Sequence, residues 1–171
     1  MEESEDVYLL RGSSELALSK KLIINVALTG NLSKKEINPN VPYSPQEIAD
    51  DARRCYSLGA TFFHIHTRED DGRPSCRREL FEETIAKIRK HCPEAIVCAT
   101  TSGRIFKSFE ERSAVLDIEG SLKPDFASLT LGSMNFPKEA SVNSPDMIER
   151  LAVKMAKKGI RAELEVFETG M

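Results

Sequence analysis

The chain has 171 residues, of which 40% are hydrophobic and 30% charged, the balance of an ordinary soluble domain with a sizeable core. Its formal net charge of −3 comes from 24 basic and 27 acidic residues. These mixed charges create no positive field for a phosphate backbone, so we expect no nucleic-acid partner. No apolar run reaches the roughly 18 residues that cross a bilayer, so we expect no membrane partner.

Residues 1–20 are polar and lack a sustained hydrophobic period, which predicts a mobile N-terminal extension with at most a short helix near residues 14–18. Four of its first six residues are acidic, unlike a secretory or mitochondrial presequence. The four cysteines have no CxxC spacing, which predicts reduced thiols in a cytoplasmic protein. Cys55 and Cys98 fall in apolar segments and are expected to be small core residues.

The rest of the chain, residues 21–171, alternates predicted strands and helices. The β-branched run at 22–28 predicts a buried strand. Ser44 as N-cap, Pro45 at the first position and Glu47 in a capping box predict a helix over 45–58. The same signals predict strands at 60–67, 95–99, 126–131 and 161–167, helices at 79–91 and 145–158, and a weaker helix at 109–116.

A strand that recurs about every 35 residues, usually followed by a helix, is typical of a parallel α/β fold. An open doubly wound sheet and a (β/α)₈ barrel both fit this repeat. In the strands at 126–131 and 161–167, hydroxyls or carboxylates alternate with apolar residues. The polar face needs a polar lining, which the mouth of a barrel provides. Because a full barrel takes about 250 residues, we expect residues 21–171 to form about the first five strand–helix units of a (β/α)₈ TIM-barrel catalytic domain.

Two of the three histidines, His64 and His66, stand two residues apart in the predicted strand at 60–67. Their side chains point the same way from roots about 6–7 Å apart, so they can bind one metal ion. Two strand histidines that are hydrogen-bonded to neighbours are an equally good interpretation of the pair alone. A catalytic zinc site needs about three protein ligands, and the third would be Glu165 or a residue outside this chain.

Other polar residues follow the predicted strands, where a barrel places its active site. The turn at 100–103 is rich in hydroxyls, and its backbone N–H groups can hold a carboxylate, although such turns are also common without a ligand. Arg68 and Asp70 either orient metal ligands or form a surface ion pair. His91 is expected to cap a helix C-terminus. Glu163 and Glu165 are alternatively solvated residues of an exposed strand. The full polar set is Thr29, Asn31, His64, His66, Thr100, Thr101, Ser102, Ser128, Thr130, Glu163, Glu165 and Glu168.

Five motifs in this order resemble the β-keto acid cleavage enzyme family, typified by 3-keto-5-aminohexanoate cleavage enzyme, over about residues 21–171. They are NPNVP at 38–42, HIHTREDDGRP at 64–74, LKPD at 122–125, GSMNF at 132–136 and ELEVFETGM at 163–171. The resemblance implies a (β/α)₈ barrel that forms a homo-oligomer and carries zinc at its mouth. It also implies a reaction in which a β-keto acid and acetyl-CoA give acetoacetate and a new CoA thioester.

The resemblance further implies roles for individual residues. His64 and His66 match the two histidine ligands of the zinc. Thr100 matches a serine that, with Thr101, Ser102 and Gly103, holds the substrate carboxylate. Ser128 and Thr130 match substrate-pocket positions, and Glu165 matches a catalytic pocket glutamate.

The chain also departs from the family pattern. Leu32 replaces a glutamate, Thr130 an asparagine and Ser102 a glycine. The third metal ligand and the acid–base residues of the family are expected in a late strand beyond Met171. Two alternatives therefore stay open: a diverged, non-catalytic metal-binding or association paralogue, and a metal-dependent aldolase or hydrolase on the same barrel.

Overall fold

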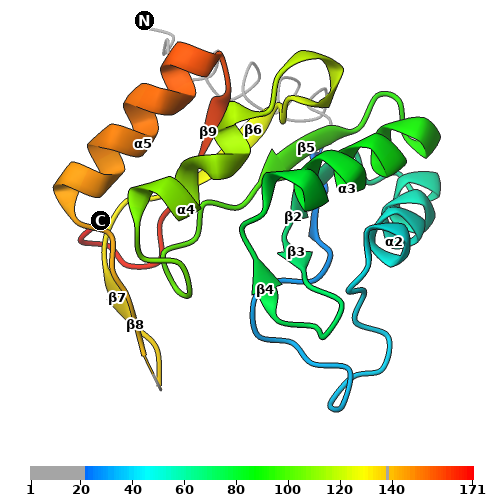
Figure 1. Cartoon of the computed structure of the whole chain (residues 1–171), viewed down its shortest axis with the longest axis horizontal. Helices are drawn as coiled ribbons and strands as arrows, with labels where there is room; N and C mark the ends of the chain where they lie inside the picture. The colour runs from blue at the N-terminus through cyan, green and yellow to red at the C-terminus, as the bar shows by residue number, and fades with distance from the viewer. Residues whose placement is uncertain (1–21, 138) are drawn as a thin grey trace, which may run out of the picture.

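The computed structural model describes residues 22–137 and 139–171. The predicted N-terminal extension lies outside these residues. The central element is a five-stranded parallel sheet with the order β1-β2-β5-β6-β9 (Figure 1). Its strands are β1 (Asn25–Ala27), β2 (Phe62–Ile65), β5 (Ile96–Ala99), β6 (Phe126–Thr130) and β9 (Arg161–Glu165).

Each strand of this sheet pairs with the next strand of the same sheet along the chain. The order of the strands in space therefore follows their order in the sequence throughout. A doubly wound sheet reverses its strand order at a switch point, whereas a barrel wall does not. Four helices lie along one side of the sheet (Figure 1): α2 (Pro45–Ser57), α3 (Arg78–His91), α4 (Phe109–Ser113) and α5 (Pro145–Lys158).

Local sequence signals set the helix ends. Ser44 accepts the Glu47 N–H at 3.2 Å while the Glu47 carboxylate accepts the Ser44 N–H at 2.9 Å, as the capping box predicts. Gly159 ends α5 in the left-handed conformation, with φ of 62°. The predicted helix at 109–116 is shorter than expected, because the chain tightens after α4 into the 3₁₀ helices η1 (Ala114–Asp117) and η2 (Gly120–Leu122).

All five predicted strands are longer than the observed ones, three of them by two residues or more. The strand at 60–67 leaves the sheet after Ile65, and two of the following residues form β3 (Thr67–Arg68), which pairs antiparallel with β4 (Pro74–Ser75). Of the predicted strands at 22–28 and 161–167, only Asn25–Ala27 (β1) and Arg161–Glu165 (β9) are strands in the structure. A second small hairpin, β7 (Met134–Asn135) with β8 (Ala140–Ser141), follows β6.

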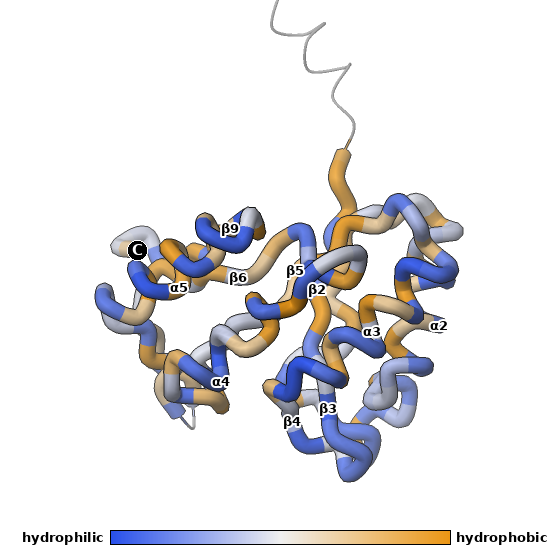
Figure 2. The backbone as a smooth tube through the Cα atoms, turned by 45° about the horizontal axis from the view of Figure 1, so that its top comes forward, coloured by the Kyte–Doolittle hydropathy of each residue, from blue (hydrophilic) through white to orange (hydrophobic). Residues whose placement is uncertain are grey.

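The hydrophobic core lies between the helices and the outer face of the sheet. Phe63, Ile65 and Val97 point from the strands toward the helices and are fully buried. Full burial of one such side chain stabilises the fold by about 1.5–3 kcal/mol. Figure 2 shows hydrophobic residues along the central strands and a hydrophilic β3–β4 hairpin. The helix residues that complete this core include Ile48, Phe81, Ile85, Ile88 and Leu151.

The inner face of the sheet has a different character. It carries side chains that alternate with the core residues, among them His64, Cys98 and Glu163. Asn25 of β1 donates a 2.6 Å hydrogen bond to Glu163 of β9, although these are the two edge strands. In a flat sheet, four spacings of about 4.8 Å would separate them by about 19 Å. The sheet is therefore strongly curved, with its polar face inside, as the predicted α/β barrel requires.

The outer face of β9 is less covered than the rest of the sheet. Leu164 is 61% exposed, whereas Leu129, its register partner on β6, is 4% exposed. Within residues 22–137 and 139–171, no helix combines the length and the apolar character needed to span a bilayer.

Candidate active site and metal-binding pair

His64 and His66 lie side by side at the end of β2, with ring centroids 5.1 Å apart and 8% of each residue exposed. His64 Nδ1 is 2.8 Å from Glu163 Oε2, and His66 Nδ1 is 3.0 Å from Asn31 Oδ1. Both partners are acceptors, so each Nδ1 carries the proton and donates. In the neutral form of such a ring Nε2 keeps its lone pair, and this is the form in which imidazole binds a metal.

The charge states around the pair suit metal binding. Burial, with smaller contributions from His64 and Arg68, lowers the pKa of His66 to about 3, so this ring is neutral at pH 7. The hydrogen bond from His64 lowers the pKa of Glu163 below its ordinary value, although burial opposes the effect. The pair therefore combines a neutral His66 ring with an ionised carboxylate behind His64. Two such imidazoles fit zinc, which prefers nitrogen ligands.

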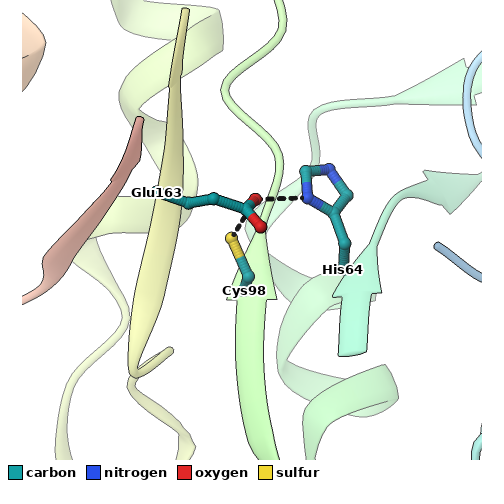
Figure 3. Close-up of side chains that lie close together, drawn as sticks. All are labelled: His64, Cys98 and Glu163. Carbon is teal, nitrogen blue, oxygen red and sulfur yellow. Dashed lines mark hydrogen bonds and ion pairs between the residues drawn. The ribbon is translucent and has the colours of Figure 1, made fainter. Parts of the chain in front are cut away.

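A second group on the inner face also has metal-compatible residue types. Ligand atoms of His64, Cys98 and Glu163 lie within 4.8 Å of one another (Figure 3). Hydrogen bonds account for this closeness, since Cys98 Sγ donates to Glu163 Oε2 at 3.1 Å. Burial, reinforced by Glu163, raises the pKa of the Cys98 thiol, so the sulfur keeps the proton that it donates to Glu163. The trio is better explained as a hydrogen-bonded cluster, and Cys98 is buried as expected.

The described residues offer His64 and His66 no third ligand that forms a comparably close group with them. Glu165, the candidate within the chain, lines the same cleft, but its Oε2 accepts a 2.6 Å hydrogen bond from Thr130. The third ligand therefore stays a prediction.

An open cleft of about 310 Å³ lies in front of the histidines. Its polar walls bring together six of the nine residues to which the resemblance gave roles: His64, His66, Thr100, Ser102, Thr130 and Glu165. Asn31 of the wider polar set lines it as well. Leu32, Arg104 and Phe136 also line the cleft, with the Arg104 guanidinium 3.7 Å above the Phe136 ring. Glu168 is exposed and does not line the cleft.

The other predicted residues of the turn lie behind the cleft. Thr101 is 2% exposed, donates its N–H to Ser128 Oγ at 3.0 Å and its hydroxyl to the Ser128 carbonyl at 2.5 Å. These bonds fasten the turn to β6. The Ser102 N–H donates to Thr100 Oγ1 at 3.1 Å, which shapes the part of the turn that faces the cleft.

Arg112 also stabilises the turn at residues 100–103, a role that the sequence did not predict. It is 4% exposed, and its Nε donates to the Thr101 carbonyl at 2.8 Å while its Nη2 donates to Asn143 Oδ1 at 2.7 Å. A Cβ on Gly103 would lie 2.6 Å from Arg112 Nη1, so the guanidinium occupies the space that a side chain would need. The sequence around Arg112 is charged and favours a solvated side chain, whereas its partners Thr101, Val142 and Asn143 lie 11, 30 and 31 positions away.

Arg68 does not form the surface ion pair that was one of the two roles predicted for it. It is 3% exposed, so it forms no surface ion pair, and its guanidinium donates to the carbonyls of Gly30 at 2.6 Å, Ser33 at 3.1 Å and Gly72 at 2.8 Å. It thus holds the loop after β1, which carries Asn31 to His66. Its pKa is lowered by burial. Asp70 is exposed, and His91 is the last residue of α3, where Cys92 is the C-cap.

A curved parallel sheet with helices on its outer face and paired histidines on its inner face defines a barrel-type α/β protein with a candidate metal-dependent site. The model of the beta-keto acid cleavage enzyme family matches residues 21–171. The chain therefore belongs to the β-keto acid cleavage enzyme family, as the motifs indicated.

Individual relatives agree with this assignment. The chain is 40% identical over 153 residues to a 3-keto-5-aminohexanoate cleavage enzyme of Acetoanaerobium sticklandii, covering 89% of this chain and 55% of the relative. It is 38% identical over 154 residues to a 3-oxoadipate:acetyl-CoA acetyltransferase of Cupriavidus necator, covering 90% and 52%. The chain thus spans about half the length of these curated relatives.

Among solved structures, the binary complex of ObcA with oxaloacetate matches with a TM-score of 0.70 and 24% identity, covering 77% of this chain and 32% of that one. A putative phosphonomutase from Burkholderia cenocepacia matches with a TM-score of 0.55 and 13% identity, covering 97% and 65%. At these identities the matches are evidence about the fold only, and they support the α/β barrel class.

Proposed function

We propose that the protein is a metal-dependent β-keto acid cleavage enzyme that converts a β-keto acid and acetyl-CoA into acetoacetate and a new CoA thioester. The observation that carries the proposal is the pair His64 and His66, whose Nδ1 atoms are both bonded to acceptors, at one wall of a polar cleft. The names of two relatives, a 3-keto-5-aminohexanoate cleavage enzyme and a 3-oxoadipate:acetyl-CoA acetyltransferase, support both substrates.

In this proposal His64 and His66 hold zinc through Nε2. When bound, zinc supplies Lewis acid chemistry that polarises the keto oxygen of the substrate. The Thr100 hydroxyl and the turn formed with Thr101, Ser102 and Gly103 bind the substrate carboxylate. Thr101 acts mainly by shaping this turn, because its N–H and hydroxyl are bonded to Ser128.

Glu165 is the catalytic carboxylate of this part of the cleft. Its Oε2 accepts the Thr130 hydroxyl at 2.6 Å, which orients the carboxylate and leaves its second oxygen to accept a hydrogen bond from the substrate. Thr130 thus contributes to the pocket by orienting Glu165. Ser128 contributes by holding the turn at residues 100–103 in place. We assign no third zinc ligand and no further acid–base residue within the described chain.

The proposal is tested with the full-length, zinc-loaded protein. Acetyl-CoA is offered with a panel of β-keto acids, and acetoacetate is measured. We expect acetoacetate with at least one substrate, none after His66→Ala, and an unchanged rate after Glu149→Gln, which alters an exposed residue of α5. Absence of acetoacetate with every substrate would contradict the proposal. Cleavage without CoA would favour a metal-dependent aldolase or hydrolase.

Leu32 favours a second candidate function, metal binding without turnover. It is 49% exposed and lines the cleft at a position where the resemblance implies a glutamate. If this candidate holds, the native protein binds zinc but makes no acetoacetate, and Leu32→Glu gains activity. An active native protein would rule it out.

We also propose that the protein is cytoplasmic and forms a homo-oligomer. The four cysteines are all free, which suits a reducing compartment. Leu164 and Val166, on the outer face of β9 and just beyond it, are 61% and 56% exposed and offer apolar surface for association. Mass in solution tests the assembly, and a monomer at micromolar concentration would contradict it.

A further inference from the structure

The two histidines are held by partners of different charge and rigidity. We propose that Glu163 is a positioning residue, which fixes His64 as the Nδ1–H tautomer and directs its Nε2 into the cleft. This inference deepens the proposed function, because it rests on the metal site that His64 and His66 would form. Neither the sequence nor the names of the relatives assign this role to Glu163.

Three strands supply hydrogen-bond donors that hold Glu163 itself. Asn25 Nδ2 of β1 lies 2.6 Å from Oε1, while His64 Nδ1 of β2 and Cys98 Sγ of β5 lie 2.8 Å and 3.1 Å from Oε2. Figure 3 shows the carboxylate between the thiol and the imidazole. Since both oxygens are occupied, the carboxylate cannot rotate without losing a bond. Its position is therefore fixed before any metal arrives.

The hydrogen bond that positions His66 is weaker than the one that positions His64. Its Nδ1 donates to the amide oxygen of Asn31, which stands on the loop after β1 rather than on a strand. A hydrogen bond to an ionised acceptor is roughly twice as strong as one between neutral groups. The carboxylate also makes Nε2 of His64 more basic, so this nitrogen donates its lone pair to a metal more strongly. Loss of Glu163 should therefore weaken metal binding more than loss of the Asn31 side chain.

The experiment uses the full chain labelled with ¹⁵N-histidine. The chain has only three histidines, so His64, His66 and His91 can be assigned by single substitutions. Long-range ¹H–¹⁵N spectra of the metal-free protein report which ring nitrogen carries the proton. We expect Nδ1–H for His64 in the native chain and a mixture of tautomers after Glu163→Ala.

Zinc affinity is the second readout. Removing such a supporting partner typically lowers metal affinity 10–100-fold, and we expect a loss of this size for Glu163→Ala. Glu163→Gln keeps an acceptor oxygen and should restore most of the affinity. Asn31→Ala should cost less than Glu163→Ala, and Glu149→Gln, matched in chemistry but exposed, should cost nothing. If Glu163→Ala fails to fold, Glu163→Leu, which fills a similar volume but offers no acceptor oxygen, decides the case by the same two readouts.

Two results would overturn the inference. One is an Nε2–H tautomer of His64 in the native chain, and the other is unchanged zinc affinity in Glu163→Ala. A sulfur-to-metal charge-transfer band in the Co²⁺-loaded protein, lost in Cys98→Ser, would instead make His64, Cys98 and Glu163 the metal ligands. Acetoacetate formation is measured separately. An inactive native protein with the expected tautomer and affinities would refute the proposed reaction and leave the positioning role standing.

Discussion

Asn25 of β1 and Glu163 of β9 are joined by a 2.6 Å hydrogen bond across the inner face of the curved sheet. Asn25→Ala removes this bond, and we expect the free energy of unfolding to fall by about 0.5–1.5 kcal/mol, because the donor is exposed and water replaces it in part. Urea denaturation measures the change. A variant as stable as the native chain would show that the bond does not help to hold the curvature.

Arg112 should matter far more for stability, since it is buried against two loops. Arg112→Ala leaves the Thr101 carbonyl and the Asn143 amide oxygen without their charged donor, and each such bond contributes about 1.5–3 kcal/mol. We expect a loss of at least about 2 kcal/mol in urea denaturation. Arg53→Ala, at an exposed position of α2, serves as the matched control and should change stability by less than about 0.5 kcal/mol.

Gly103 and Gly132 give a matched pair for the packing of the turn. A Cβ at Gly103 would meet Arg112 Nη1 at 2.6 Å and the Val142 carbonyl at 2.9 Å, whereas at Gly132 it would meet the flexible Met171 side chain at 2.9 Å. We expect Gly103→Ala to destabilise by about 1–3 kcal/mol through overpacking, and Gly132→Ala by less. Thermal melts of both variants test the ranking, and equal losses would contradict it.

Glu47 should make stability depend on pH in the acid range. The hydrogen bond from Lys35, together with those from the Ser44 and Tyr43 amides, lowers its pKa from 4.5 to about 2. A lowered folded-state pKa contributes stability that is present above pH 4.5 and is lost as the pH falls toward 2. We expect Glu47→Gln to lower stability at pH 7, by about 0.3–1 kcal/mol for the negative charge lost near the helix N-terminus, and to flatten the change between pH 5 and 2. Urea midpoints at several pH values measure this, and parallel pH curves for the two proteins would refute it.

The sequence predicted the parts of the fold that depend on neighbouring residues. The capping box at Ser44 and the stop at Gly159 place helix ends within a residue of those observed, because these signals act over three or four positions. Alternation along β9 also predicted that Glu163 and Glu165 share the polar face. Six of the nine residues to which the family resemblance gave roles line one cleft.

What the sequence did not predict depends on contacts between distant segments. Glu163 receives donors from positions 65, 99 and 138 residues away, so no local pattern indicates its contacts. Arg68 is similar, since its burial follows from the path of the loop at residues 30–33. A charged side chain in a polar segment is expected at the surface, and only the folded chain shows which carbonyls draw it inside.

The central claim is that His64 and His66 bind zinc. It is tested most directly by measuring zinc binding in variants in which one histidine at a time is replaced. In the full-length protein we expect one zinc ion per native chain and per His91→Ala chain, since His91 is an exposed residue at the end of α3. His64→Ala and His66→Ala should each lower zinc affinity by more than about 100-fold, because each removes a ligand rather than a supporting partner. Native-like affinity in either of these two variants would contradict the account.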